Sequence, residues 1–187
     1  MSEIDKVMYV FPGQGSQYPG MGQDLYLGFA TAKEIFEQAN DILNYDLVKI
    51  AFTDPNDQIG LTRYTQPILL THQMACFRVF QELTSSKIAP VLSAGHSLGE
   101  YTALIVAGVL SFEDGLKLVS KRGELMGEYG QGSMLALPLM RDEAQLIAEN
   151  HGCQVATMNL PQQTVVGGKD SDVEKLESTF AELYPRK

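Results

Sequence analysis

The amino-acid sequence predicts an α/β protein in two parts, and three observations indicate it. Two short apolar runs, 7–11 and 90–94, each end in a glycine-containing turn that leads toward helical periodicity. Residues 131–187 follow another rhythm, in which a strand is followed by a helix, two strands and a second helix. With 44% hydrophobic and 20% charged residues among 187, the composition is that of a globular protein with a sizeable core.

The elements of the first part, residues 1–130, follow from apolar spacing and turn residues. Residues 7–11 are expected to form a buried strand because the run is apolar and stops at Pro12-Gly13. Pro67 is expected in the first turn of a long helix, where proline is tolerated, and Ser111 is expected to cap another helix. The expected order is strand 7–11, helices within 24–44 and at 47–52, helix 67–84, strand 90–94, buried helix 101–107 and a helix after Ser111.

The second part, residues 131–187, begins after a glycine-rich break. The expected elements are strand 133–137, helix 142–149, strands 153–159 and 164–168, and helix 171–184. This order matches a ferredoxin-like split β-α-β sandwich that lacks its last strand. We therefore expect a small, partial ferredoxin-like subdomain here.

Composition excludes several classes of function. The formal net charge is -9, from 14 basic and 23 acidic residues, which argues against nucleic-acid binding. No apolar stretch is long enough to span a bilayer, and the acidic N-terminus does not resemble a signal peptide, so a cytoplasmic protein without membrane contact is expected. The two isolated cysteines, Cys76 and Cys153, indicate neither a metal site nor a disulfide scaffold.

The strongest chemical signal is the segment Gly95-His96-Ser97-Leu98-Gly99, which fits G-x-S-x-G. It lies between a predicted strand and a predicted helix, as a nucleophile elbow requires, and glycines are needed because the turn is tight. Ser97 is therefore the candidate nucleophile, and the N–H of Leu98 at the helix N-terminus is a candidate oxyanion donor. The alternative is a strand-to-helix turn that contains a serine by chance.

A nucleophilic serine needs a base, usually histidine. The chain has three: His96 beside the serine, His72 in the long apolar helix, and His151 in a helix C-terminal turn. Neighbouring side chains at such a turn point apart, His72 is expected to be packed or on the surface, and His151 is expected to have a capping role. We therefore expect the general base to lie outside this chain.

Two further features are open to more than one interpretation. The loop 11–17 fits neither a dinucleotide-binding nor a P-loop pattern; the Gln14 N–H could serve as a second oxyanion donor, or the loop could be an ordinary turn. Arg122 lies on a mostly apolar helix face and needs an anionic partner. That partner could be any Asp or Glu, or the free carboxylate of a substrate held by the guanidinium fork.

Together these motifs resemble the malonyl-CoA:acyl carrier protein transacylase family, which includes the acyltransferase domains of fatty acid and polyketide synthesis. The resemblance covers essentially the whole chain. The motifs that carry it are Phe11-Pro12-Gly13-Gln14-Gly15-Ser16-Gln17 with Met21-Gly22, Tyr64-Thr65-Gln66-Pro67, Gly95-His96-Ser97-Leu98-Gly99-Glu100-Tyr101, Lys121-Arg122-Gly123 and Gly132-Ser133-Met134. Any one is weak, whereas all five in this order are specific.

The resemblance implies a mechanism and its partners. Ser97 would take the malonyl group from malonyl-CoA, with Gln14 and Leu98 as oxyanion donors and Arg122 on the malonyl carboxylate. His96 and Gln66 would line the substrate pocket. The phosphopantetheine thiol of an acyl carrier protein would then accept the group, and no cofactor is implied beyond coenzyme A as part of the substrate.

The family fold is an α/β-hydrolase-like subdomain with a ferredoxin-like insertion, so 1–130 is expected to be the N-terminal part of the former and 131–187 part of the latter. In the family, a catalytic histidine follows later in a Gly-x-Phe-His motif, which this chain does not contain. We therefore expect impaired activity in this chain, which would be a fragment, a shortened gene product or half of a split protein. A C-terminal complementing segment would then be a partner.

Alternatives remain at this point. A hydrolase that edits carrier-bound chains would use the same serine, although Arg122 weighs against it. A non-catalytic remnant that binds coenzyme A or a carrier protein would explain the missing histidine. Tyr18, Phe11 and Met126 are possible lining residues of the acyl pocket, but core packing is favoured for Phe11 and Met126.

Overall fold

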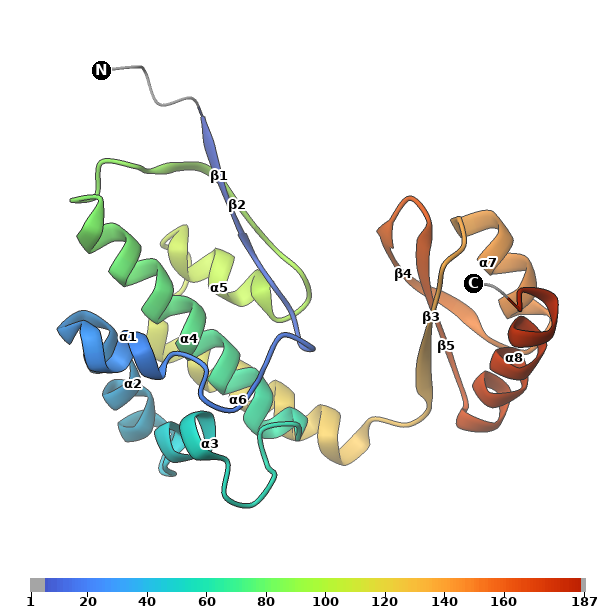
Figure 1. Cartoon of the computed structure of the whole chain (residues 1–187), viewed down its shortest axis with the longest axis horizontal. Helices are drawn as coiled ribbons and strands as arrows, with labels where there is room; N and C mark the ends of the chain where they lie inside the picture. Colours follow the sequence, from blue (N-terminus) through green and yellow to red (C-terminus); the bar gives the residue numbers. More distant parts are fainter. Residues whose placement is uncertain (1–5, 186–187) are drawn as a thin grey trace. The chain divides into compact units, whose positions relative to one another are not determined.

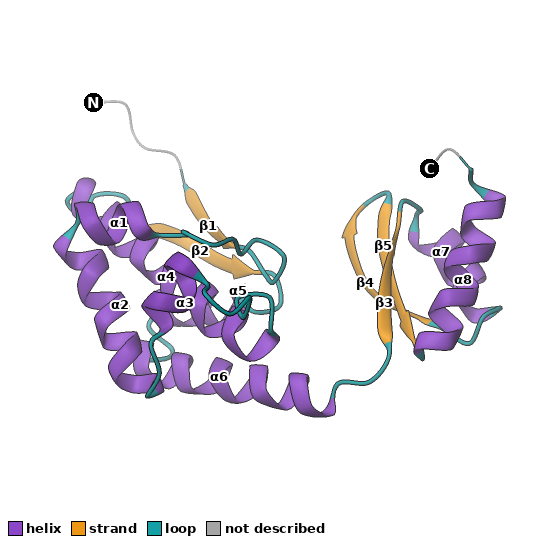
Figure 2. Ribbon diagram, turned by 60° about the horizontal axis from the view of Figure 1, so that its bottom comes forward, coloured by secondary structure: helices purple, strands orange, loops and turns teal. Residues whose placement is uncertain are grey.

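The computed structural model describes residues 6–185, and the chain divides into two compact units, Met1–Tyr129 and Gly130–Lys187. The sequence analysis placed this division after residue 130. Both units combine helices with strands, as Figures 1 and 2 show, so the predicted mixed α/β class is confirmed. Each unit has its own apolar core.

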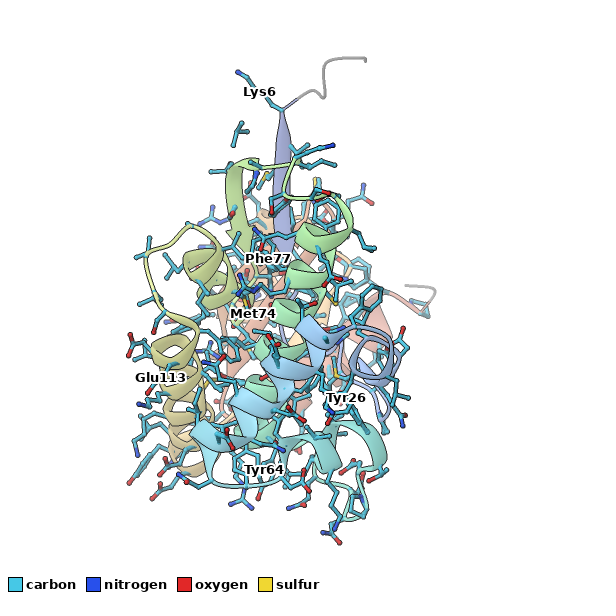
Figure 3. The ribbon with its side chains drawn as sticks, turned by 90° about the vertical axis from the view of Figure 1, so that its left-hand side faces the viewer. Lys6, Tyr26, Tyr64, Met74, Phe77 and Glu113 are labelled. Carbon is cyan, nitrogen blue, oxygen red and sulfur yellow. The ribbon has the colours of Figure 1, made fainter. Side chains whose placement is uncertain are left out.

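The first unit follows the predicted order of elements. Its bounds are β1 Val7–Phe11, α1 Gln23–Gly28, α2 Ala30–Leu43, α3 Leu47–Thr53, α4 Thr62–Leu83, β2 Pro90–Gly95, α5 Gly99–Val106 and α6 Phe112–Tyr129. Its core is built mainly by side chains that the helices bury completely, among them Phe36, Leu47, Ile68, Leu70 and Leu116. Figure 3 shows Met74 of α4 lying among the helices, whereas Glu113 points outward from α6.

Strands β1 and β2 form a parallel pair in which Phe11 lies opposite Gly95. A parallel pair needs a long crossover, and helices α1 to α4 supply it. Since parallel strands end at the same edge of a sheet, the turns after Phe11 and after Gly95 leave the sheet side by side. This arrangement positions the candidate site.

The predicted burial of the first strand is wrong in part. Val7, Tyr9 and Phe11 face inward, and the Tyr9 ring meets Phe77 of α4 edge-on at 5.9 Å between ring centroids. Val10, on the other face, is 69% exposed. The described residues contribute only two strands to this sheet, so the outward side chains have little to pack against. Helix α5, predicted to be buried, is likewise buried on one side only.

The long helix also begins earlier than predicted. Helix α4 starts at Thr62, so Pro67 lies inside it and not in its first turn. The Thr65 hydroxyl explains the extra turn, because it donates to the Ile59 carbonyl (2.6 Å) and the Leu61 carbonyl (3.1 Å). These bonds support the turn before Pro67, where the missing proline N–H removes one helical hydrogen bond.

The second unit follows the predicted β-α-β-β-α order. Its bounds are β3 Ser133–Leu137, α7 Arg141–Glu149, β4 Gln154–Leu160, β5 Gln163–Gly168 and α8 Asp170–Leu183. The three strands form an antiparallel sheet of order β3-β5-β4. Helices α7 and α8 pack on one face through residues such as Ile147, Leu176 and Phe180, while Met134 and Met158 on the other face are exposed.

Between residues 6 and 185, no helix is long and apolar enough to cross a membrane. In the same range, no group of three or more His, Cys, Asp or Glu side chains is placed to hold a metal ion.

Candidate active site

Ser97 occupies the turn between the end of β2 and the start of α5, and its side chain is exposed. Its backbone φ is 51°, in the left-handed region that residues other than glycine seldom adopt. Such a conformation costs on the order of 1–3 kcal/mol and persists only where the surroundings impose it. The hydroxyl therefore stands at the top of a strained turn, as the G-x-S-x-G pattern predicted.

The flanking glycines explain what imposes this turn. A Cβ added at Gly95 would overlap the backbone of Gly99, and a Cβ added at Gly99 would overlap the Phe11 carbonyl. The His96 N–H also donates to the Phe11 carbonyl at 3.0 Å. The turn is thus packed against β1 without room for any side chain at either glycine.

Helix α5 starts directly after the serine turn, and the N–H groups of Gly99 and Glu100 donate to the His96 and Ser97 carbonyls at 3.0 and 3.2 Å. Leu98 is the N-cap residue of α5 and is fully buried, which anchors the turn in the core. The first N–H groups of a helix have no partner within the helix, and they lie at the positive end of the helix dipole. Negative charge that develops near Ser97 is therefore met by a favourable field.

The glycine-rich loop after β1 lies against the same turn. A Cβ added at Gly13 would come within 2.7 Å of the His96 carbonyl oxygen, so only glycine fits there. The Ser16 hydroxyl donates to the Gly13 carbonyl at 3.0 Å and holds the loop in a tight turn. The Gln14 side chain is exposed, with its amide nitrogen 3.4 Å from the Thr62 hydroxyl. The structure thus brings the Gln14 loop to the Ser97 turn.

Arg122 of α6 reaches the nucleophile directly. Its Nη2 donates to Ser97 Oγ at 2.9 Å, and its Nη1 donates to Gln66 Oε1 at 2.7 Å. Among residues 6–185, no carboxylate forms an ion pair with Arg122. The alternative of an Asp or Glu partner is therefore not seen among the described residues, and the fork is held by neutral oxygens.

Gln66 and Gly123 hold Arg122 within hydrogen-bond distance of Ser97. Gln66 is completely buried at the start of α4, and its amide also lies 3.3 Å from the Met126 sulfur. A Cβ added at Gly123 would come within 2.8 Å of the Thr62 carbonyl oxygen, so this glycine lets α6 approach α4 closely. Both motifs, Thr-Gln-Pro and Lys-Arg-Gly, thus serve to place Arg122.

The other two histidines are engaged elsewhere. His72 Nε2 lies 3.5 Å from the Cys76 sulfur, and burial lowers the pKa of this imidazole despite the opposing influence of Asp24. His151 belongs to the second unit, where Nδ1 lies 2.7 Å from the Ile147 carbonyl and Nε2 3.0 Å from the Thr179 hydroxyl. The expected capping role of His151 is confirmed.

The three possible lining residues of the acyl pocket differ in their exposure. Phe11 is buried in the core, as expected, and Tyr18 is exposed. Met126 is 45% exposed and contacts the Gln66 amide, so its expected core position is wrong. Two buried polar residues not predicted from the sequence, Gln73 and Thr102, form hydrogen bonds that lead to the loop after β1. Their only signal was a polar side chain at apolar positions of two helices.

Residues 8–182 match the acyl transferase domain family. The chain is 41% identical over 180 residues to the malonyl CoA-acyl carrier protein transacylase of Bacillus subtilis, across 91% of this chain and 56% of that protein. The solved transacylase structure from Coxiella burnetii, also 41% identical, gives a TM-score of 0.87 over 93% of this chain and 57% of that one.

A malonyl-transacylase solved in complex with a type II PKS acyl-carrier protein gives a TM-score of 0.86 at 37% identity, over 92% of this chain and 58% of that one. The chain therefore spans little more than half the length of the relatives it matches. Within that span, the match includes the Ser97 turn, the loop after β1 and Arg122. As its motifs predicted, the chain belongs to the acyl transferase domain family.

Proposed function

We propose that this chain carries the nucleophile and the carboxylate-binding arginine of a transacylase that moves malonyl groups from malonyl-CoA to the phosphopantetheine thiol of an acyl carrier protein. The observation that carries the proposal is the 2.9 Å hydrogen bond between Arg122 Nη2 and Ser97 Oγ. The named functions of the relatives, malonyl CoA-acyl carrier protein transacylases, agree with it.

The closeness of the two groups favours a short diacid. In a malonyl thioester, a single methylene group separates the carboxylate from the carbonyl carbon that the serine attacks. An arginine within hydrogen-bond distance of the attacking oxygen is therefore placed to hold that carboxylate during attack. A guanidinium fork binds a carboxylate through two parallel hydrogen bonds, which fixes orientation as well as charge.

The reaction proceeds in two displacements. Ser97 Oγ attacks the thioester carbonyl, the carbon–sulfur bond breaks, and the serine proton passes through a base to the departing coenzyme A thiolate. The carrier thiol then attacks the malonyl-serine ester, the ester carbon–oxygen bond breaks, and the proton of the carrier thiol passes through the base to Ser97 Oγ. The N–H groups of Leu98 and Gln14 are the proposed donors to the oxyanion of each tetrahedral intermediate.

The two units correspond, in this proposal, to part of an α/β-hydrolase-like subdomain and part of a ferredoxin-like one. The strand order β3-β5-β4 supports the ferredoxin-like assignment, because it leaves β3 at an edge of the sheet. In a ferredoxin-like sheet the fourth strand lies beside the first strand, which is β3 here. A complementing C-terminal segment is the proposed source of that strand and of the base. Exposed Val10 of β1 and Val91 of β2 are consistent with a sheet that accepts further cover.

The test follows the malonyl group after incubation with malonyl-CoA and a carrier protein bearing phosphopantetheine. We expect malonyl-carrier product. Its formation should be thousands-fold slower than with a transacylase that also carries the catalytic base, which we propose lies in the complementing segment. Release of free malonate without carrier product would favour an editing hydrolase. No acyl transfer of either kind would favour a non-catalytic remnant.

Coenzyme A as the leaving part of the substrate, and the absence of any other cofactor, remain predictions. So does a cytoplasmic location. The chain matches both a malonyl CoA-acyl carrier protein transacylase and a polyketide biosynthesis malonyl CoA-acyl carrier protein transacylase, so no pathway is assigned.

A further inference from the structure

Two buried polar side chains form a short chain of hydrogen bonds that ends on the loop after β1. Thr102 of α5 is completely buried, and its hydroxyl donates to Gln73 Oε1 at 2.5 Å. Gln73 of α4 is 5% exposed, and its Nε2 donates to the Pro12 carbonyl at 2.8 Å. The three residues come from three separate elements, so this chain joins α5, α4 and the end of β1.

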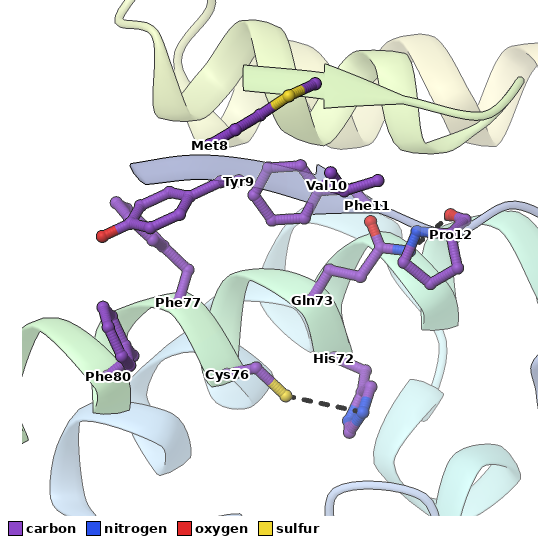
Figure 4. A pocket seen from close by; sticks show the side chains of 10 residues that line it. All are labelled: Met8, Tyr9, Val10, Phe11, Pro12, His72, Gln73, Cys76, Phe77 and Phe80. Carbon is purple, nitrogen blue, oxygen red and sulfur yellow. Dashed lines mark hydrogen bonds between the residues drawn. The ribbon is translucent and has the colours of Figure 1, made fainter. Parts of the chain in front are cut away.

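The direction of each bond is determined by chemistry. A carbonyl oxygen only accepts hydrogen bonds, so the amide nitrogen of Gln73 must face Pro12. The amide oxygen then faces Thr102, whose hydroxyl must donate. Figure 4 shows Gln73 turned toward Pro12 at one end of a cavity of about 410 Å³, whose other lining side chains are mostly apolar.

Pro12 is an effective point at which to hold this loop. The proline ring fixes φ, so the direction of the next peptide depends on ψ alone. A hydrogen bond to the Pro12 carbonyl fixes that remaining angle. Gly13 follows Pro12 and packs against the His96 carbonyl. The N–H after that of Gly13 belongs to Gln14.

We propose that Gln73 and Thr102 are positioning residues, which hold the Pro12 carbonyl so that the Gln14 N–H faces the oxyanion formed at Ser97. This inference rests on the proposed function, in which Gln14 is an oxyanion donor. Neither side chain touches the reacting atoms, since both act through the loop backbone. Loss of an entire oxyanion donor costs on the order of 100- to 1000-fold in rate, so a displaced donor is expected to cost about tenfold.

The test measures how fast Ser97 reacts with a fluorophosphonate, which bonds to a serine oxygen with loss of fluoride and places a phosphoryl oxygen where the oxyanion would lie. Thr102→Val removes the hydroxyl with little change of shape, Gln73→Leu removes the amide, and Thr102→Ser restores a hydroxyl. Thr71→Val is the matched control, because the Thr71 hydroxyl is equally buried on α4 but donates to the Pro67 carbonyl.

We expect labelling about tenfold slower in Thr102→Val and Gln73→Leu, near-normal labelling in Thr102→Ser, and unchanged labelling in Thr71→Val. Melting temperatures separate this result from a loss of fold, since Thr71→Val should lower the melting temperature as much as Thr102→Val. Equal labelling rates in Thr102→Val and Thr71→Val, with both folded, would overturn the positioning role. Failure of the unchanged chain to label at Ser97 would instead overturn the proposed function.

Discussion

The two units differ in what their buried polar groups do. In the first unit, Gln66, Gln73 and Thr102 are almost completely buried, and their hydrogen bonds lead to Arg122 or to the loop beside Ser97. In the second unit, the buried Thr164 hydroxyl donates to the Leu139 carbonyl and closes a local turn. Burying a polar group is costly unless it is hydrogen-bonded. The buried hydroxyls of Thr65 and Thr71 in the first unit also bond nearby carbonyls, so it is the long-range bonds of the first three residues that distinguish the site.

The sharpest test of this difference removes the serine hydroxyl. Ser97→Ala should abolish fluorophosphonate labelling of the chain, because the proposed nucleophile is gone. Burial raises the pKa of the Cys76 thiol, with Asp24 adding to the effect, so this cysteine should not substitute as a nucleophile. The measurement is intact-protein mass after labelling. Residual labelling at the original rate would place the reactive group elsewhere.

Next in expected size is the effect of the elbow glycines on stability. Gly95→Ala should lower the free energy of unfolding by about 3 kcal/mol or more, because the added methyl overlaps the Gly99 backbone. Gly127→Ala, at an exposed position of helix α6, is the control, since its added methyl meets nothing within 4 Å. That change should stabilise the chain by up to about 1 kcal/mol. Denaturant unfolding would measure both, and similar effects would contradict the strained turn.

Arg122 is expected to control which acyl group reaches the serine. Arg122→Leu should slow malonylation of Ser97 by on the order of 30-fold, because the malonyl carboxylate loses its charged partner. Acetylation from acetyl-CoA should not slow, since acetyl has no carboxylate. The ratio of the two acylation rates, followed by mass, is the measurement. A parallel loss with both donors would show that the arginine acts on the serine and not on the substrate.

A change in the second unit should lower stability and leave the labelling rate of Ser97 unchanged. The Ile147 carbonyl can only accept, so His151 Nδ1 donates to it, while Nε2 lies 3.0 Å from the Thr179 hydroxyl. His151→Ala removes both bonds and should lower the free energy of unfolding of this unit by about 1 kcal/mol. Hydrogen exchange in α7 and α8 would measure this loss. Slower Ser97 labelling in this variant would break the proposed division of roles.

The smallest expected effect concerns pH. Burial lowers the pKa of His72 in the folded state below its usual value of about 6.5, so the unfolded chain binds more protons there. Stability should therefore fall as the pH falls below about 6.5, and it should fall less in His72→Gln. Unfolding of both chains between pH 5 and 7.5 is the check. Identical pH dependence in the two chains would show that the imidazole does not contribute.

Local patterns predicted much of this molecule because several signals agree at the same residues. The strands at 7–11 and 133–137 match the structure residue for residue, since Pro12-Gly13 ends the first apolar run and a glycine-rich break precedes the second. The Ser97 turn was predictable for the same reason. The glycines on both sides, the strand before and the helix after all point to one conformation.

The sequence-based predictions fail where contacts between distant residues determine the local structure. Thr65 hydroxyl bonds extend α4 ahead of Pro67, and the bonds depend on a loop that folds back. Met126 was assigned to the core by hydrophobicity, although it is 45% exposed and its sulfur lies beside the Gln66 amide. Gln73 and Thr102 lie 29 residues apart, and only the folded chain brings their side chains together.

The most direct test of the central claim is the mass of the chain after long incubation with malonyl-CoA, followed by peptide mapping. A malonyl ester on Ser97 is the predicted result, and it should persist if, as proposed, the base that assists its removal lies in a complementing segment. Ser97→Ala should gain no malonyl group under the same conditions. A chain that folds yet stays at its original mass, or a malonyl group that maps to another residue, would contradict this account.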